Sequence, residues 1–472
     1  SDSGDPIEGA TVTGTRAGSG EQLFEATTSS DGSYEASYSV KATNEPSDVD
    51  FAVSAGDFTS GGATVAFAEE IARDFQLEPK TTEATVSGAV TRSDNSDPID
   101  GVTVTGSPAG GSEKLFETTT NASGEYETTF EVKVPDEPDQ ISVTANSGDY
   151  DGSEKTVDFG SAITTDFALD PSEVNVTIDG TITAKLDGST VEGAEVSAFR
   201  PNGSGALAST TSEMGGAYSL SFTVLAPDAP DELRLEANES RFDEATLTVG
   251  FSESIGQDIA LSSIEISTID ELQAIQTDSD FPLDGYYKQT ADIDASGFGS
   301  FQPIGDEIVP FSGTFDGKKF AISNLNIENE GEPNSFFRFI SEDGVLKDVR
   351  LKGVKVNAAS NGPAGLVGVN RGLIESIYLK GIIIGDLISV GGVVSKNYGV
   401  IKSVEANVTV EGAFDTGGLV SFNSGMIRDA HVTGEISGGN NIGGVVGRNG
   451  GSGTVINSSS SVNISSNTDN MG

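Results

Sequence analysis

The 472 residues are enough for three or four domains, yet only 35% are hydrophobic, Gly numbers 59 and Trp is absent, which favours short strands and turns over helical cores. The 73 acidic against 26 basic side chains, a net charge of −47, argue against nucleic acid and anionic membrane surfaces as partners. The lack of Cys excludes disulfides and Cys-ligated zinc, and no apolar run is long enough for membrane insertion within this segment.

The acidic surface has two interpretations. Dense salt screens the repulsion between carboxylates, so the composition resembles that of proteins from salt-loving microbes. Alternatively, the carboxylates gather Ca²⁺, a cation that binds oxygen ligands. Because the sequence contains no D-x-[DN]-x-[DN]-G loop, we favour salt adaptation, expect no cofactor and keep Ca²⁺ as the alternative. Either interpretation predicts an extracellular protein at the cell surface.

The first 262 residues contain one unit repeated three times. Three landmarks, a Gly, a Tyr and an Asp, each recur at a constant spacing of 92 residues, which indicates tandem duplicated domains. The landmarks are Gly9, Gly101 and Gly193; Tyr34, Tyr126 and Tyr218; and Asp74, Asp166 and Asp258.

Each unit has the pattern of a β-sandwich. Alternating Val-Thr-Val runs are separated by turn pairs such as Asp31-Gly32 and Ser123-Gly124, where Gly accepts a positive φ. About seven short strands in roughly 90 residues fit an immunoglobulin-like sandwich. The predicted domains are residues 1–79, 80–171 and 172–262.

The order of motifs within the unit is similar to a known family. Asp5-Pro-Ile-Glu-Gly-Ala-Thr-Val and Asp97-Pro-Ile-Asp-Gly-Val-Thr-Val are followed by a T-x-S-x-G-x-Y pattern, with Ala122 at the Ser position in the second repeat. This resembles carboxypeptidase-regulatory or transthyretin-like domains and the related B-type stalk domains of collagen adhesins. The resemblance implies a fold and not an activity.

The first repeat starts one strand later than the others. Ser1 aligns with Ser93, which follows the expected opening strand of the second repeat, residues 83–91. The first repeat therefore lacks its opening strand, and a sandwich without a strand exposes unpaired backbone and part of its core. Two explanations remain open: residues upstream of this sequence supply the strand, or another subunit donates it.

A second periodic array follows residue 263. Residues 264–275 predict a short helix with Thr268 as N-cap, and residues 286–293 predict a strand. A Gly-Leu/Val-Val-x-x-Asn motif then recurs every 26 or 27 residues from Gly365, which resembles the GLUG repeat of prokaryotic adhesins. We expect an all-β chain: three tandem Ig-like sandwiches and a parallel, right-handed β-helix over 263–472, capped at its start and truncated at its end.

The motif asparagines fall at the same corner of each predicted coil. We expect a stacked amide ladder there, with ligand binding as the alternative role. The ladder residues are Asn370, Asn397, Asn423 and Asn449.

No residue pattern predicts catalysis. The sole His, His431, lies at a variable, solvent-facing coil position, so no two-His zinc site can form. Asp292 and Asp294 alternate on one strand face, where solvation or turn capping is the expected role and metal or sugar binding the alternative.

Asn-x-Ser/Thr sequons suggest a glycoprotein. Asn175 also begins a sequon, but it lies on a predicted strand and is the poorest candidate. The glycosylation candidates are Asn121, Asn202, Asn238, Asn407, Asn457 and Asn463.

These features predict a non-enzymatic structural or adhesive surface protein. It would form a stalk or filament by self-association, through strand donation to the first repeat, or bind a cell-surface partner or glycan. A glycan- or receptor-binding fibre, viral or cellular, is the first alternative, and a carbohydrate-active β-helix enzyme is the second.

Overall fold

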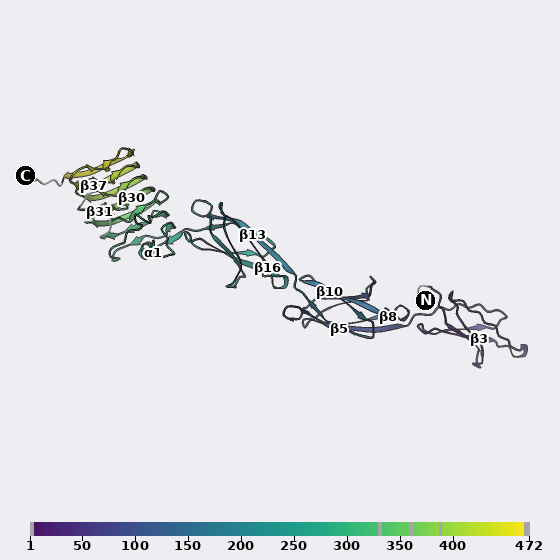
Figure 1. Cartoon of the computed structure of the whole chain (residues 1–472). Helices are drawn as coiled ribbons and strands as arrows, with labels where there is room; N and C mark the ends of the chain where they lie inside the picture. Colours follow the sequence, from purple (N-terminus) through teal and green to yellow (C-terminus); the bar gives the residue numbers. More distant parts are fainter. Residues whose placement is uncertain (1–3, 329–332, 359–361, 387–388, 467–472) are drawn as a thin grey trace, which may run out of the picture. The chain divides into compact units, whose positions relative to one another are not determined.

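The computed structural model describes residues 4–328, 333–358, 362–386 and 389–466. Strands dominate these residues, and the prediction of an all-β chain with sandwich sheets and a C-terminal β-helix is confirmed (Figure 1). The chain forms two compact units, Ser1–Val174 with Thr223–Ala229, and Asn175–Phe222 with Pro230–Gly472. The finer division into four domains stays a prediction. Within the described residues, no helix is long and apolar enough to cross a membrane.

The first sandwich contains one complete sheet, in the order β2-β1-β3-β4, with antiparallel pairing throughout. The residues facing this sheet, 34–41 and 67–78, run without strand pairing. Ser1, on which the predicted alignment with Ser93 depends, lies outside the described residues. The elements are β1 (Thr11–Arg16), β2 (Gln22–Thr27), the 3-10 helix η1 (Ala42–Asn44), β3 (Asp48–Ser54) and β4 (Gly61–Ala66).

The second sandwich has both sheets. One has the order β10-β9-β6-β7, and in the other β5 pairs antiparallel with β8 and parallel with β11 and β12. Alternate residues of β5, among them Val86 and Val90, are fully buried between the sheets. The elements are β5 (Thr81–Arg92), β6 (Thr103–Pro108), β7 (Phe116–Thr119), β8 (Glu125–Lys133), η2 (Val134–Asp136), β9 (Gln140–Ser147), β10 (Tyr150–Asp158), β11 (Ala162–Thr164) and β12 (Phe167–Leu169).

The third sandwich repeats this topology. Its sheets have the orders β15-β14-β17-β18 and β16-β13-β19, and β20 also pairs with β13. The elements are β13 (Glu173–Ala184), β14 (Glu195–Phe199), β15 (Ala206–Thr211), β16 (Ala217–Leu225), η3 (Ala226–Asp228), β17 (Glu232–Asn238), β18 (Ala245–Gly250), β19 (Ser254–Gly256) and β20 (Ile259–Leu261).

The start of the β-helix corrects two predicted elements. The helix covers only α1 (Ile269–Ala274), because Ile264 and Ile266 alternate inward on a strand, β21 (Ile264–Ile266), that pairs with β22. Thr268 caps α1 as predicted, in a capping box with Glu271. The strand predicted over 286–293 is interrupted, so β22 (Tyr286–Gln289) and β23 (Ile293–Asp294) are separate strands that pair with different strands.

The β-helix stacks its coils through parallel strands (Figure 1). Ile374, Ile401 and Ile427 pair in register and are fully buried, which builds a continuous apolar column inside the coils. Its remaining strands are β24 (Thr314–Asp316), β25 (Ala321–Ser323), β26 (Asn326–Ile327), β27 (Phe337–Ile340), β28 (Val345–Lys347), β29 (Arg350–Ala358), β30 (Val367–Asn370), β31 (Leu373–Gly385), β32 (Val390–Gly391), β33 (Val394–Asn397), β34 (Val400–Glu411), β35 (Thr416–Gly417), β36 (Val420–Asn423), β37 (Met426–Gly438), β38 (Ile442–Gly443), β39 (Val446–Asn449), β40 (Thr454–Ile456) and β41 (Ser459–Ser466).

Candidate functional site

A large groove opens in the first sandwich, opposite its one complete sheet. Its volume is about 1020 Å³, and it is lined by that sheet on one side and by the unpaired residues 34–38 and 68–77 on the other. We call it the open groove. The lining combines aromatic and aliphatic side chains with acidic and other polar ones, and its principal apolar side chains are Phe24, Tyr34, Tyr38, Phe51, Ile71 and Phe75.

The open groove lies where β5 lies in the second sandwich. There β5 runs between β8 and the strands β11 and β12, which correspond to residues 34–41 and 67–78 of the first sandwich. Without that strand the core is partly uncovered: Ile71 and Phe75 are half-buried, whereas their counterparts Ile163 and Phe167 are 6% and 2% exposed. The sequence predicted the missing strand but not the size of this groove.

A glycine on the central strand admits close backbone approach. A Cβ built on Gly88 would lie 1.9 Å from the carbonyl oxygen of Thr165, and one on Gly180 would lie 1.8 Å from that of Gln257. Any side chain at these positions would therefore force the opposing backbone away. The corresponding backbone position in the open groove belongs to Arg73, which lines the groove and occupies the repeat position of Thr165.

The recurring aspartate binds the residue that follows this glycine. The Asp166 Oδ1 atom accepts a hydrogen bond of 2.9 Å from the backbone N–H of Ala89, and Asp258 accepts one of 2.9 Å from Thr181. Asp74 holds the same repeat position and lines the open groove. Sequence reasoning used these aspartates only as landmarks; their constant spacing was the signal that could have revealed this role.

The recurring tyrosine makes the same side-chain hydrogen bond in all three sandwiches. The hydroxyl of Tyr126 donates to the Thr165 carbonyl over 2.6 Å, and that of Tyr218 donates to the Gln257 carbonyl over 2.6 Å. Tyr34 makes the equivalent 2.7 Å bond to Arg73 beside the open groove. Burial raises the pKa of Tyr218 to about 12, with smaller contributions from Asp258 and Asp179.

This pKa predicts a loss of stability at high pH. An unfolded Tyr titrates near 10, so the native state holds the Tyr218 proton more tightly than the unfolded state does. Its contribution is complete below pH 10 and falls as the pH rises towards 12. In urea titrations across this pH range, the free energy of unfolding should fall less steeply with pH in Tyr218→Phe than in the unchanged protein. An unchanged slope would contradict this role.

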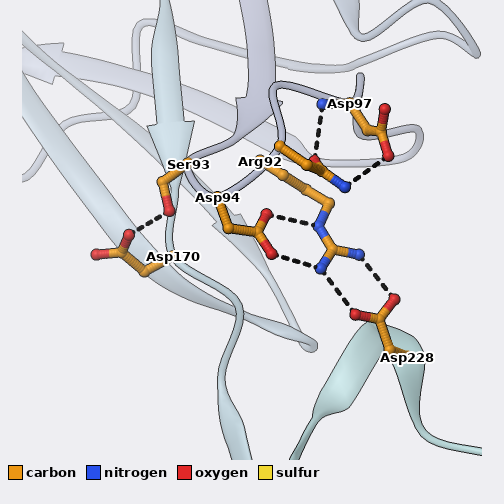
Figure 2. A network of polar contacts seen from close by, with 7 residues as sticks. Arg92, Ser93, Asp94, Asp97, Asp170 and Asp228 are labelled. Atoms are coloured by element: carbon orange, nitrogen blue, oxygen red, sulfur yellow. Dashed lines mark hydrogen bonds and ion pairs between the residues drawn. The ribbon is translucent and has the colours of Figure 1, made fainter.

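An arginine network lies at the end of β5 (Figure 2). The Arg92 guanidinium, whose side chain is 10% exposed, makes two 2.9 Å hydrogen bonds to the Asp228 carboxylate and also binds Asp94. A planar guanidinium facing a carboxylate in this way is a strong, geometrically specific pair. Nearby, Ser93 donates to Asp170.

The four predicted ladder residues lie in one column of the β-helix. Each Nδ2 donates 2.8 Å to the Oδ1 of the next Asn, from Asn370 through Asn397 and Asn423 to Asn449. Each of the first three also donates over 3.3 Å to the carbonyl two residues further on. The first three are fully buried and Asn449 is exposed, so the structure gives a stacking role to the column and leaves its amides little room for a ligand.

The other polar residues singled out in the sequence are on the surface. His431 is exposed and contacts the hydroxyl of Ser459 at 2.8 Å. Asp294 accepts the backbone N–H of Ser296 and so caps its own turn, whereas Asp292 accepts that of Ala321, 29 residues further along the chain. Across the described ranges, no group of three or more His, Asp or Glu is arranged to hold a metal ion.

All six glycosylation candidates are exposed, and whether they are modified stays a prediction. Asn121 differs from the rest in that its side-chain oxygen accepts two backbone N–H groups within its turn. The six are Asn121, Asn202, Asn238, Asn407, Asn457 and Asn463.

Comparison with known proteins gives one local sequence similarity. No family model matches the chain, so the two family resemblances stay predictions. The chain is 31% identical to halomucin of Haloquadratum walsbyi over 168 residues, which is 33% of this chain but only 2% of halomucin.

Solved structures that match part of the chain include two pilins. The Bacillus anthracis TIE protein matches with 12% identity and a TM-score of 0.28, covering 54% of this chain and 48% of that one. A streptococcal ancillary pilin matches with 11% identity and a TM-score of 0.20, covering 51% of this chain and 81% of that one. Shaft pilin SpaA of Lactobacillus rhamnosus GG matches with 12% identity and a TM-score of 0.18, covering 40% of this chain and 99% of that one. TM-scores this low carry no weight for the function.

Proposed function

We propose that this protein is an extracellular structural or adhesive component of a cell surface, and that it is not an enzyme. In this proposal the sandwich repeats form a stalk or filament shaft and the β-helix forms a rod or contact face. Subunits join when a neighbour donates a strand to the first sandwich. The observation that carries the proposal is the architecture itself, tandem β-sandwiches followed by a β-helix of stacked coils.

Other features support this proposal. The described residues contain tandem sandwiches and stacked coils, architectures that extend by repetition, and no metal cluster lies among them. The acidic composition and the local similarity to halomucin fit a salt-adapted surface protein. Electron microscopy of the native material tests the proposal directly: regular polymers or surface stalks are expected, and uniformly dispersed single particles away from cells would refute it.

Salt adaptation predicts a strong dependence of stability on ionic strength. With a net charge of −47, repulsion between carboxylates opposes the folded state most at low salt. The melting temperature, followed by circular dichroism because Trp is absent, should rise by roughly 10 °C or more between millimolar and molar KCl. If millimolar Ca²⁺ at constant ionic strength gave the same rise, the calcium alternative would replace this explanation.

One surface feature favours glycan binding as a second candidate function. On the face formed by β33, β36 and β39, Tyr398 is 48% exposed and its ring lies 6.1 Å from that of Phe422. The Arg448 guanidinium lies 4.6 Å from the Phe422 ring and pairs with Asp415 over 3.0 Å, and the exposed Lys396 lies beside Phe422 on the neighbouring strand. Aromatic rings with adjacent cations suit an anionic polysaccharide. Binding of a carboxylated polysaccharide that is lost in Tyr398→Ala would support this candidate.

A further inference from the structure

We infer that two copies of this chain bind each other through opposite charges: a basic face on the β-helix of one copy contacts an acidic face on the second sandwich of another. The inference rests on the proposed function, since it names the surfaces of one contact between subunits. Because the two faces lie in different parts of the chain, each copy can offer one face and receive the other. Such a head-to-tail contact builds a ring or an open filament.

The basic face lies in a part of the chain whose charge opposes that of the whole protein. Residues 347–402 contain eight Lys and Arg against three Asp and Glu, whereas the whole chain has a net charge of −47. The three lysines of the face are exposed, and the ion pairs found among the described residues include none of them. The basic face consists of Arg350, Lys352 and Lys355 on β29 and Lys380 on β31.

Two lysines of the basic face oppose each other on adjacent strands. Lys352 pairs in register with Lys380, and like charges placed directly opposite destabilise a sheet. A neighbouring column of the same sheet has the reverse arrangement, since each of its lysines binds an acid on the adjacent coil. Its ion pairs are Lys288–Glu265 at 3.0 Å, Lys347–Asp316 at 3.4 Å and Lys402–Glu375 at 2.9 Å. The Lys352–Lys380 pair therefore costs stability in the free chain, and an acidic partner would offset the repulsion.

An exposed apolar side chain lies within the basic face. Ile382 is 43% exposed, follows Lys380 by two residues on β31 and pairs in register with Lys355 on β29. Protein interfaces commonly surround an apolar centre with a polar rim. Contact with another protein surface would remove Ile382 from water, which a small free anion would not do. This arrangement favours a protein partner.

The acidic face lies on the outer side of β5 and β8 in the second sandwich. Glu83 pairs in register with Glu131, so this face also contains a like-charge pair, of the opposite sign. Alternate residues of β8, among them Tyr126 and Phe130, are buried, so the glutamates between them point away from the core. The acidic face consists of Glu83, Glu125, Glu127 and Glu131, all exposed.

The other repeats show that this face does not follow from the acidic composition alone. The third sandwich has the same topology, but its four equivalent positions are neutral: Asn175, Ala217, Ser219 and Thr223. The carboxylates are therefore gathered on one repeat. Residues directly opposite on adjacent strands are about 5 Å apart in either kind of sheet. The lysine pair and the glutamate pair thus match in spacing as well as in charge.

Sedimentation velocity of the full chain at increasing protein concentration, in the lowest KCl concentration that keeps it folded, tests the inference. We expect reversible self-association that weakens at least about tenfold in Lys352→Glu/Lys380→Glu, because the substitutions set carboxylates against carboxylates. The matched control is Arg371→Glu/Lys396→Glu, which changes the net charge equally at exposed positions outside the basic face. This control should associate as the unchanged protein does.

A single substitution separates a lost contact from a damaged fold. Lys380→Glu replaces the like-charge pair by an opposite-charge pair with Lys352, so hydrogen exchange in β29 and β31 should slow. Self-association should weaken in the same variant. Faster exchange in these strands together with weaker association would attribute the loss to the fold and would overturn the inference.

Mixing two variants tests whether the contact joins two copies. Neither Lys352→Glu/Lys380→Glu nor Glu83→Lys/Glu131→Lys should self-associate, because each sets like charges against like. An equimolar mixture should associate, since each chain then meets an oppositely charged face on the other. A mixture that stays monomeric would overturn the inference and would assign the basic face to a contact within one chain or to an anionic glycan.

The outcomes also separate this inference from the proposed function. An unchanged protein that stays monomeric, or one whose association survives Lys352→Glu/Lys380→Glu, would overturn the inference. Polymers or stalks in micrographs of the native material would then leave the proposed function intact. Association that follows the charge substitutions, without polymers or stalks on cells, would support the contact and contradict the proposed function.

Discussion

Replacing Gly88 with Val should unfold the second sandwich or destabilise it by about 3 kcal/mol or more. The Cβ alone would lie 1.9 Å from the carbonyl oxygen and 2.7 Å from the carbonyl carbon of Thr165. Both atoms belong to the backbone between β11 and β12, which pair with β5. The clash can therefore be relieved only by separating β5 from these strands. The Tyr126 hydrogen bond to the same carbonyl would be lost with it. Urea denaturation followed by circular dichroism measures the free energy of unfolding.

The control for this substitution is Gly160→Val. Gly160 has open space where a Cβ would lie and its φ is not positive, so a side chain there meets nothing. We expect a change within about 0.5 kcal/mol for Gly160→Val. Equal effects of the two substitutions would show that the close approach at Gly88 does not hold the second sandwich together.

Replacing Asn397 with Leu should destabilise the coils around it by about 2–5 kcal/mol. Leu has nearly the same volume, so the change removes hydrogen bonds and leaves the packing similar. Asn423 loses the donor to its Oδ1 atom, and Asn370 loses the 2.8 Å acceptor of its Nδ2 group. Both groups are buried, so water cannot replace the missing partner. Hydrogen exchange at β33 and β36 would report the loss as faster local opening.

Asn449→Leu provides the matched comparison at the end of the column. Asn449 is exposed and accepts from Asn423 alone within the ladder, so water can compensate for its loss. We expect a cost of about 1 kcal/mol or less. A cost as large as that of Asn397→Leu would mean that stability does not come from burial of the ladder.

The repeat periods in the sequence predicted most of the fold. A spacing of 92 residues without insertion fixes equivalent positions, so the missing strand followed from alignment alone. The 26-residue Asn spacing likewise predicted the column in the β-helix, because identical residues of successive coils stack. Sequence periodicity reports the equivalence of positions, and it performs best where one structural unit is repeated.

The contacts between chain segments were less predictable. The strand character of Ile264 and Ile266 is set by pairing with β22, which a helical spacing of apolar residues does not reveal. The backbone bond accepted by Asp166 and the carbonyl approach at Gly88 join residues 77 positions apart in the chain. Such pairings depend on which strands are neighbours, and alignment of the repeats shows only that the residues recur.

Hydrogen exchange at residues 34–40, compared with residues 126–132, tests whether the first sandwich is open. The two segments occupy the same repeat position, but only the second, within β8, pairs with a central strand, β5. For the protein alone, we expect fast exchange of the amides in 34–40 and slow exchange in 126–132. Equal, strong protection of both segments would contradict it, because the first sandwich would then be closed and would have no place for a donated strand.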